Sequence, residues 1–190
     1  DCQRCHGPGA AHVSRAEKGN ILNPAKLSAD RQMEVCLQCH LETTSAALPA
    51  STRRFGRGAY SYRPGEPLGD FAVHFDHPPN TGHDDKFEIV GAAYRLRQSS
   101  CFLKSSGRLT CTTCHDPHKI VRGAPAVARQ RQVCQQCHQS AHNADSDCTS
   151  CHMPKRRTED AVHVIMTDHR IQRHLPKGDL LAPRREKEEQ

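Results

Sequence analysis

Hydrophobic positions are sparse along this chain, and a helical pattern of them is confined to a few segments. Residues 31–40 and 129–138 share an Arg-Gln pair, a Val, two Cys, a Gln and a His at the same positions. This pattern predicts a helix in each segment, and Ser28 or Asp30 is placed to cap the first one. An internal duplication explains this likeness, and so, equally well, does the independent origin of two similar helical segments.

Residues 84–103 carry a third helical pattern, which places Phe87, Val90, Tyr94 and Cys101 on one face. We expect Cys101 to be a buried free thiol, and an intermolecular disulfide is the alternative. From residue 41 onward the chain is rich in Gly and Pro, which predicts an irregular loop. The polar residues 176–190 predict a charged tail or linker after a single domain, residues 1–175. The expected fold class is therefore mainly irregular, with short α-helices and little or no β-structure.

The composition does not support an ordinary hydrophobic core. Leu, Ile, Val and Phe make up only about 16% of the 190 residues, yet the net charge of +6 is too small for a disordered chain. Something other than side chains is therefore expected to fill the interior. The modest charge comes without a recognition motif, which argues against nucleic-acid binding. No apolar run approaches the ~20 residues that span a bilayer, so no transmembrane segment is predicted.

Ten of the eleven cysteines fall in the pattern C-x-x-C-H, which attaches c-type haem. Two thiols at this spacing each form a thioether with one vinyl group of a porphyrin, and the next residue presents its imidazole to the iron. Zinc sites and disulfide frameworks also use paired cysteines, but zinc does not need a His after every second Cys. The sequence therefore predicts five covalently attached haem c groups. The attachment residues are Cys2, Cys5, Cys36, Cys39, Cys111, Cys114, Cys134, Cys137, Cys148 and Cys151, and the proximal iron ligands are His6, His40, His115, His138 and His152.

Nine further histidines and only three methionines favour bis-His coordination of the irons. His12, His118 and His142 follow their own motifs too closely to wrap around the same porphyrin, so each is expected to reach a neighbouring haem. His74 and His174 are not expected to be ligands. The candidates outnumber the irons, so some are surface residues or bind haem outside this chain. The distal candidates are His12, His77, His83, His118, His142, His163 and His169.

Residues 2–13 (CQRCHGPGAAHV), 111–118 (CTTCHDPH) and 148–170 (CTSCHMPKRRTEDAVHVIMTDHR) resemble multihaem c-type cytochromes of the doubled CXXCH kind. The resemblance is strongest to large exported bacterial members whose haem domain continues into tetratricopeptide repeats. It implies a haem-filled core and distal ligation of other haems by His12, His118 and His169. Because such proteins carry further haem sites upstream and helical repeats downstream, we expect this chain to be a fragment.

Electron transfer along closely packed haems is the favoured function, with other redox proteins or cytochromes as partners. A homopolymer joined through haem–haem contacts, forming an extracellular wire, is one form of this hypothesis. The alternative is an oxidoreductase with one open haem acting on nitrite or hydroxylamine, with Tyr94, Arg95 and Arg97 as candidate acid/base groups. Basic runs at residues 53–54 and 155–157 either pair with haem propionates or form a solvated face. Covalent haem attachment occurs outside the cytoplasmic membrane, so an exported protein is expected, periplasmic or at the cell surface.

Overall fold

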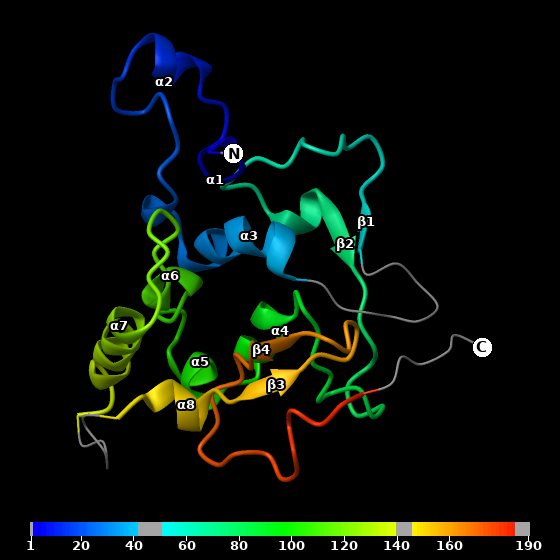
Figure 1. The fold of residues 1–190 in the computed structure, drawn as a ribbon. Coiled ribbons are helices and arrows are strands. Elements are labelled where there is room, and N and C mark those ends of the chain that lie inside the picture. The colour runs from blue at the N-terminus through cyan, green and yellow to red at the C-terminus, as the bar shows by residue number, and fades with distance from the viewer. Residues whose placement is uncertain (1, 42–50, 140–145, 185–190) are drawn as a thin grey trace. The chain divides into compact units, whose positions relative to one another are not determined.

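The computed structural model describes residues 2–41, 51–139 and 146–184, which form two compact units, Asp1–Asp84 and Asp85–Gln190 (Figure 1). Short helices joined by irregular segments make up most of both units, and the strands are few and short. The predicted fold class is therefore confirmed. None of the helices in these ranges is long and apolar enough to cross a membrane.

The longest helix of the first unit is α3 (Ala29–His40), which confirms the first predicted helix. It begins at Ser28, whose hydroxyl accepts a hydrogen bond from the Arg31 N–H at 3.5 Å, and it buries Met33, Val35 and Leu37. The other elements are α1 (Gln3–His6), α2 (Ala10–Ser14), the 3₁₀ helices η1 (Pro24–Lys26) and η2 (Leu68–Asp70), and the antiparallel strands β1 (Ser51–Arg53) and β2 (Ala72–His74).

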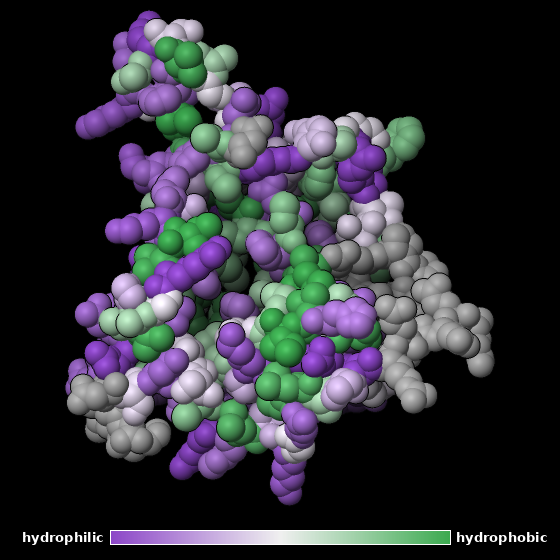
Figure 2. Space-filling view, in the orientation of Figure 1, coloured by the Kyte–Doolittle hydropathy of each residue, from purple (hydrophilic) through white to green (hydrophobic). Residues whose placement is uncertain are grey.

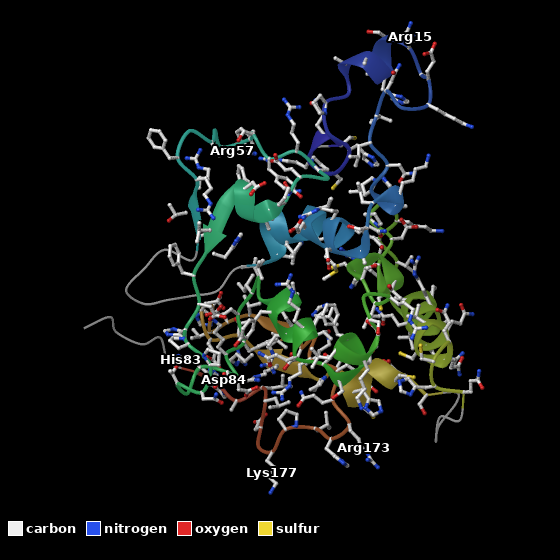
Figure 3. All side chains as sticks on the ribbon, turned by 180° about the vertical axis from the view of Figure 1, so that it is seen from behind. Arg15, Arg57, His83, Asp84, Arg173 and Lys177 are labelled. Carbon is white, nitrogen blue, oxygen red and sulfur yellow. The ribbon has the colours of Figure 1, made fainter. Side chains whose placement is uncertain are left out.

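The segment between β1 and β2 is irregular, as predicted, and Arg57 holds it together (Figure 3). Its guanidinium forms an ion pair with Glu66 and donates to the Ser61 carbonyl at 3.0 Å and the Asp70 carbonyl at 3.2 Å. It also lies 5.3 Å from the centre of the Phe71 ring. One side chain therefore ties together several turns of a loop that has little apolar core.

The second unit consists of short helices and one β-hairpin. Strands β3 (Lys155–Arg157) and β4 (Ile165–Thr167) pair antiparallel, with Arg156 opposite Met166. The helices are α4 (Ala92–Arg97), α5 (Ser100–Lys104), α6 (Cys111–Cys114), α7 (Ala124–Gln135) and α8 (Cys148–His152). Helix α7 confirms the second predicted helix, although it begins earlier and ends before His138.

The prediction of one helix through residues 84–103 is wrong, because the structure has turns followed by α4 and α5. The break falls at Ser99, which has extended backbone angles of φ −75° and ψ 133°. The Ser99 hydroxyl is buried and accepts a hydrogen bond from the Ile171 N–H at 2.8 Å. This long-range bond requires a turn where the hydrophobic pattern alone would continue the helix.

The core is small and unusually polar. Of the five largest side chains with almost no exposed surface among the described residues, only Leu37 is apolar, and the others are Arg95, Ser99, Thr158 and Asp168. Large apolar side chains are at the surface instead, and Figure 2 shows them gathered in patches, one of them over the β3–β4 hairpin. The most exposed include Val13, Phe55, Tyr60 and Ile120.

The first part of the predicted tail packs on strand β3. The backbone N–H of Arg157 donates to the Leu180 carbonyl at 2.9 Å, and its guanidinium donates to the carbonyls of Leu181 and Ala182. Arg184 forms an ion pair with Glu159 at 3.0 Å. Residues 180–184 are therefore fixed to the second unit, and a boundary at residue 175 stays a prediction.

Candidate haem sites

Each of the five C-x-x-C-H motifs begins in or directly beside a short helix. Helices α1, α3 and α8 end at the motif histidines His6, His40 and His152. His115 directly follows α6, whereas α7 ends inside its motif and His138 lies beyond the helix. Residues three apart lie on the same side of a helix, so in the motifs that a helix spans both thiols are on one side, as attachment to a single porphyrin requires.

Two motif helices are capped by the residue that precedes the first cysteine. Thr110 and Thr113 form a reciprocal capping box around α6. Asp147 accepts hydrogen bonds at the start of α8 from the Thr149 N–H at 2.9 Å and the Ser150 N–H at 3.3 Å. Such caps satisfy backbone donors that a helix of one turn cannot bond internally.

The first and last motif histidines are held in the same way by a distant backbone segment. His6 Nδ1 lies 2.8 Å from the Leu22 carbonyl oxygen, and the Leu22 N–H donates to the His6 carbonyl at 3.2 Å. His152 Nδ1 lies 2.7 Å from the Gln172 carbonyl oxygen, and the Gln172 N–H donates to the His152 carbonyl at 3.0 Å.

The hydrogen bond between Nδ1 and the backbone carbonyl determines which ring nitrogen of His6 and His152 is available to a metal. A carbonyl oxygen can only accept, so Nδ1 carries the proton in both His6 and His152 and the lone pair is on Nε2. A backbone carbonyl on the second nitrogen is the usual arrangement behind a metal-bound histidine. Both rings are therefore prepared to bind iron through Nε2, which fits the haem predicted at these motifs.

Motifs within each unit are close to one another. In the first unit the Gln38 side chain, inside the second motif, donates to the carbonyl of Arg4, inside the first, at 3.0 Å. Burial raises the pKa of the Cys5 thiol, and the neighbouring Cys36 raises it further. The two attachment sites of this unit are therefore neighbours in space.

The attachment sites of the second unit also cluster. The pKa of the Cys134 thiol rises to about 11, mainly through burial and then through Cys148 and Cys114. Burial also raises the pKa of the Cys101 thiol, with a smaller contribution from Cys137. Cys101 is half-buried, and its state as a free thiol stays a prediction.

One predicted distal ligand faces a motif histidine. The imidazole rings of His115 and His169 have centroids 6.1 Å apart and planes inclined by 34°. His169 Nδ1 lies 3.1 Å from the Thr167 carbonyl oxygen, so its Nε2 also carries the lone pair.

The other candidates are placed differently. The rings of His77 and His83 stack with centroids 3.7 Å apart, which is too close for an iron to lie between them. Figure 3 shows His83 beside Asp84. His118 and His163 are exposed, and His118 Nδ1 lies 3.9 Å from Asp116.

His12 is half-buried, and its Nδ1 is buried with no hydrogen-bond partner among the described residues. His142 lies outside the described residues.

Two cavities border attachment motifs, one in each unit. A cavity of about 110 Å³ is lined by Cys114, His115 and Arg129, among others. A larger one of about 510 Å³ borders the first motif and has Arg4 and Arg63 in its wall. Guanidinium groups at such a wall suit carboxylates such as haem propionates.

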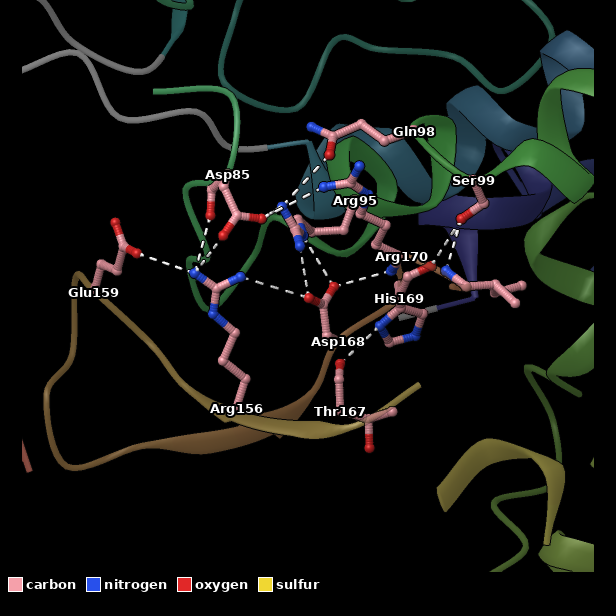
Figure 4. A network of polar contacts seen from close by, with 11 residues as sticks. Asp85, Arg95, Gln98, Ser99, Arg156, Glu159, Thr167, Asp168, His169 and Arg170 are labelled. Carbon is pink, nitrogen blue, oxygen red and sulfur yellow. Dashed lines mark hydrogen bonds and ion pairs between the residues drawn. The ribbon is translucent and has the colours of Figure 1, made fainter. Parts of the chain in front are cut away.

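A buried ion-pair network that the sequence reasoning missed lies beside His169 (Figure 4). Arg95 binds both carboxylate oxygens of Asp168, at 2.9 and 2.6 Å, and also contacts Asp85 at 3.0 Å. Arg156 contacts Asp85 at 3.0 Å and Asp168 at 3.7 Å. Because Arg95 is fully buried and paired, it is not placed to act as the acid/base group suggested above.

The basic run at residues 155–157 has a role in the fold that the sequence did not indicate. Arg156 is buried in the network, and Arg157 donates to the carbonyls of Val162, Leu181 and Ala182. Arg156 and Arg157 therefore support the β3–β4 hairpin, Lys155 is exposed, and pairing of this run with haem propionates stays a prediction. The partners of Arg156 and Arg157 include residues far away in the sequence, so the sequence pattern could not show these contacts.

The motifs and two comparisons with known proteins support a multihaem c-type cytochrome, and the doubled CXXCH motifs indicate covalently bound haem c. The doubled CXXCH motif family matches residues 105–143, which contain the third and fourth motifs. The chain is 24% identical over 174 residues to the multiheme cytochrome MtrA of Shewanella baltica (strain OS185), covering 88% of this chain and 46% of that protein. It thus spans about half the length of the curated relative it matches. No solved structure matches the chain.

These findings confirm the resemblance found in the sequence and support electron transfer in general. A continuation into tetratricopeptide repeats stays a prediction.

Proposed function

We propose that the chain carries haem c at all five of its motifs and passes electrons among them, with most irons held between two histidines. The observation that carries this proposal is the facing pair His115 and His169. Saturated irons exchange electrons without binding substrate, and the protein supplies their spacing, burial and axial ligands.

The separation of the two rings fits one iron between them. With a metal–nitrogen bond of about 2.0 Å and about 1.2 Å from each nitrogen to its ring centre, imidazoles on opposite sides of one metal have centroids about 6.4 Å apart. The observed 6.1 Å is close to that value, whereas the 3.7 Å between His77 and His83 is far below it. His115 is therefore the proximal ligand and His169 the distal ligand of the same iron in this proposal.

The closeness of the motifs within each unit supports electron exchange between haems. The bond from Gln38 to Arg4 joins the first two motifs, and the contact of Cys134 with Cys148 joins the last two. Porphyrins attached at such neighbouring sites lie close together, which rapid electron hopping requires. The small core and exposed apolar side chains such as Val13 and Ile120 are also expected of a chain that packs around porphyrins.

We further propose that the protein is exported, because haem is attached outside the cytoplasmic membrane, and that its partners are other redox proteins. End-to-end assembly into a wire would need a histidine from one copy to bind a haem of the next. His163 and the stacked pair His77 and His83 are the exposed or half-exposed candidates for that role. Size-exclusion chromatography and electron microscopy of the haem-loaded chain test the assembly separately.

The test is a haem count combined with carbon monoxide binding on the haem-loaded chain. Pyridine haemochrome absorbance and intact mass should give one haem per motif, and the dithionite-reduced Soret band should not shift with carbon monoxide. Replacing Cys111 and Cys114 by Ala should remove about one haem or prevent maturation. The matched control Cys101→Ala, outside every motif, should leave the count unchanged.

A haem count lower than the number of motifs would overturn the proposal that all five carry haem. A carbon monoxide shift in the unmodified chain would reveal an open iron. It would favour the alternative of an oxidoreductase acting on nitrite or hydroxylamine.

A further inference from the structure

We infer that Arg95 and Ser99 are positioning residues that hold His169 opposite His115. The inference rests on the proposed pairing of those two histidines around one iron. Arg95 acts through the side chain of Asp168, and Ser99 acts through the backbone of His169 and Ile171. Both lie in the segment 84–103, for which the sequence predicted an amphipathic helix and no role in holding a histidine.

Arg95 acts through Asp168, the residue directly before His169. Both side chains have no exposed surface, and the guanidinium binds the two carboxylate oxygens at 2.9 and 2.6 Å. Asp168 Oδ1 also accepts a hydrogen bond from the Arg170 N–H at 2.9 Å. The carboxylate of the residue before His169 is therefore bonded to the backbone of the residue after it. The two-point geometry of an arginine and a carboxylate fixes orientation as well as distance.

Ser99 acts on the backbone of His169 itself. Its buried hydroxyl accepts from the Ile171 N–H at 2.8 Å and lies 3.4 Å from the His169 carbonyl oxygen, within donating distance. Residues 168–172 follow β4 and belong to no helix or strand, and backbone bonds hold the segment at its two ends, from the Asp168 N–H to the Pro154 carbonyl at 2.8 Å and from the Gln172 N–H to the His152 carbonyl at 3.0 Å. Between those two ends, Arg95 and Ser99 add the side-chain contacts that fix the residues on either side of His169 (Figure 4).

The ring has its own restraint at Thr167. The carbonyl of that residue holds Nδ1 at 3.1 Å, which sets the rotation of the imidazole. Residues 167, 168 and 169 are thus all bonded to fixed partners, and a ligand held in this way loses little freedom when it binds a metal.

The chemistry of the network favours a positioning role over simple stability. Burying charged groups costs solvation that their attraction only partly returns, and well-packed apolar residues often do as well. A chain so short of core residues nevertheless places a fully buried arginine and aspartate beside a ligand candidate. The benefit of the buried pair Arg95 and Asp168 is that it defines the position of His169.

The test compares three variants of the full haem-loaded chain: Arg95→Gln, Ser99→Ala and Arg97→Gln. Arg97 lies on the same helix but is exposed, so it controls for loss of a charge from α4. The readouts are the carbon monoxide-reactive haem per chain, the high-spin signal in the electron paramagnetic resonance spectrum, and the haem midpoint potentials. His169→Ala calibrates the scale, because removing the ligand should open about one haem per chain.

The expected result is a new high-spin, carbon monoxide-reactive fraction in Arg95→Gln and Ser99→Ala, with unchanged haem content. One midpoint potential should shift in both variants, and Arg97→Gln should match the unmodified chain. Arg95→Lys keeps the charge but loses the two-point contact, so it should open a smaller fraction than Arg95→Gln.

If His169→Ala opens no haem, the proposed pairing fails and the inference fails with it. If His169→Ala opens one but Ser99→Ala and Arg95→Gln keep every haem low-spin at unchanged potentials, the pairing stands and the positioning role is overturned. Should Arg95→Gln fail to mature, Ser99→Ala decides between these outcomes, because it removes one hydroxyl and leaves every charge paired.

Discussion

At the scale of single residues, backbone groups hold several of the histidines that matter most. The carbonyls of Leu22, Gln172 and Thr167 orient the rings of His6, His152 and His169. A carbonyl oxygen is the same in every residue, so the sequence has no signal for these bonds. The motifs could be predicted because cysteine and histidine are chemically distinctive, whereas the groups that orient them could not.

The network of Arg95 and Asp168 was missed for a related reason. The sequence singled out residue 169 because a histidine can bind iron, and it gave Asp168 no role of its own. The two partners are 73 positions apart, and only folding brings them together. Long-range pairs of common charged residues leave no local pattern in a single sequence.

Arg57 offers a residue-scale prediction in the first unit. Replacing it with Gln removes an ion pair with Glu66 and two hydrogen bonds to carbonyls, so we expect a loss of about 1–2 kcal/mol of unfolding free energy. Denaturant unfolding of the haem-loaded chain measures it. Arg53→Gln is the matched control, because Arg53 is exposed and makes one bond at 3.4 Å, and an equal loss there would refute the assignment.

The same contact predicts a dependence on pH. Partial burial acts to raise the pKa of Glu66, but the hydrogen bonds from Arg57 and the Arg63 N–H outweigh it and hold that pKa below its usual value. A lowered folded pKa means that stability is complete above the unfolded pKa of about 4.3 and is lost as the pH falls below it. Thermal unfolding at pH values from 7 to about 3 should show this loss. Glu66→Gln should reduce its steepness, and an unchanged acid slope would argue against the ion pair.

At the scale of elements, the likeness of residues 31–40 and 129–138 is only partly kept in the structure. Helix α3 runs through both motif cysteines to His40, whereas α7 stops at Gln135, between Cys134 and Cys137. Val35 is buried in α3, but α7 has no buried residue. The local sequence therefore predicts a helix in both places, and the packing around each decides where the helix ends.

Helix α8 gives the element-scale prediction. Asp147→Ala removes the side chain that accepts the Thr149 and Ser150 N–H groups, so the helix holding the last motif should lose about 1 kcal/mol. A lower midpoint in thermal unfolding and a lower haem content at the fifth motif, measured by peptide mass spectrometry, are the expected results. Asp147→Asn keeps a capping oxygen and should behave like the unmodified chain. Equal defects in both variants would show that charge, and not capping, matters here.

At the scale of the whole molecule, the sequence predicted the fold class because it has too few apolar residues for an ordinary core. Few apolar side chains and many haem motifs indicated short helices and irregular segments, and the structure agrees. The division into two units was not predicted, since the sequence suggested one domain through residue 175. No run of linker residues marks position 84, so the division follows from contacts and not from composition.

The division leads to a prediction about separate fragments. Residues 85–190 contain three motifs, the facing pair His115 and His169, and the complete network around Arg95, so their contacts do not depend on the first unit. Expressed alone with the haem attachment machinery, this fragment should take up haem at all of its motifs. It should also remain low-spin and unreactive toward carbon monoxide at the third motif.

A cut after residue 123 is the matched control, because it separates His115 from His169 inside one unit while leaving every motif whole. That break should open the third haem to carbon monoxide unless the two pieces associate, which size-exclusion chromatography would reveal. A fragment 85–190 that takes up no haem would show that these residues do not mature on their own. If instead the haem at the third motif of the chain binds carbon monoxide in the fragment 85–190, its distal ligand comes from the first 84 residues. His12, whose buried Nδ1 has no partner among the described residues, would then be the first residue to replace.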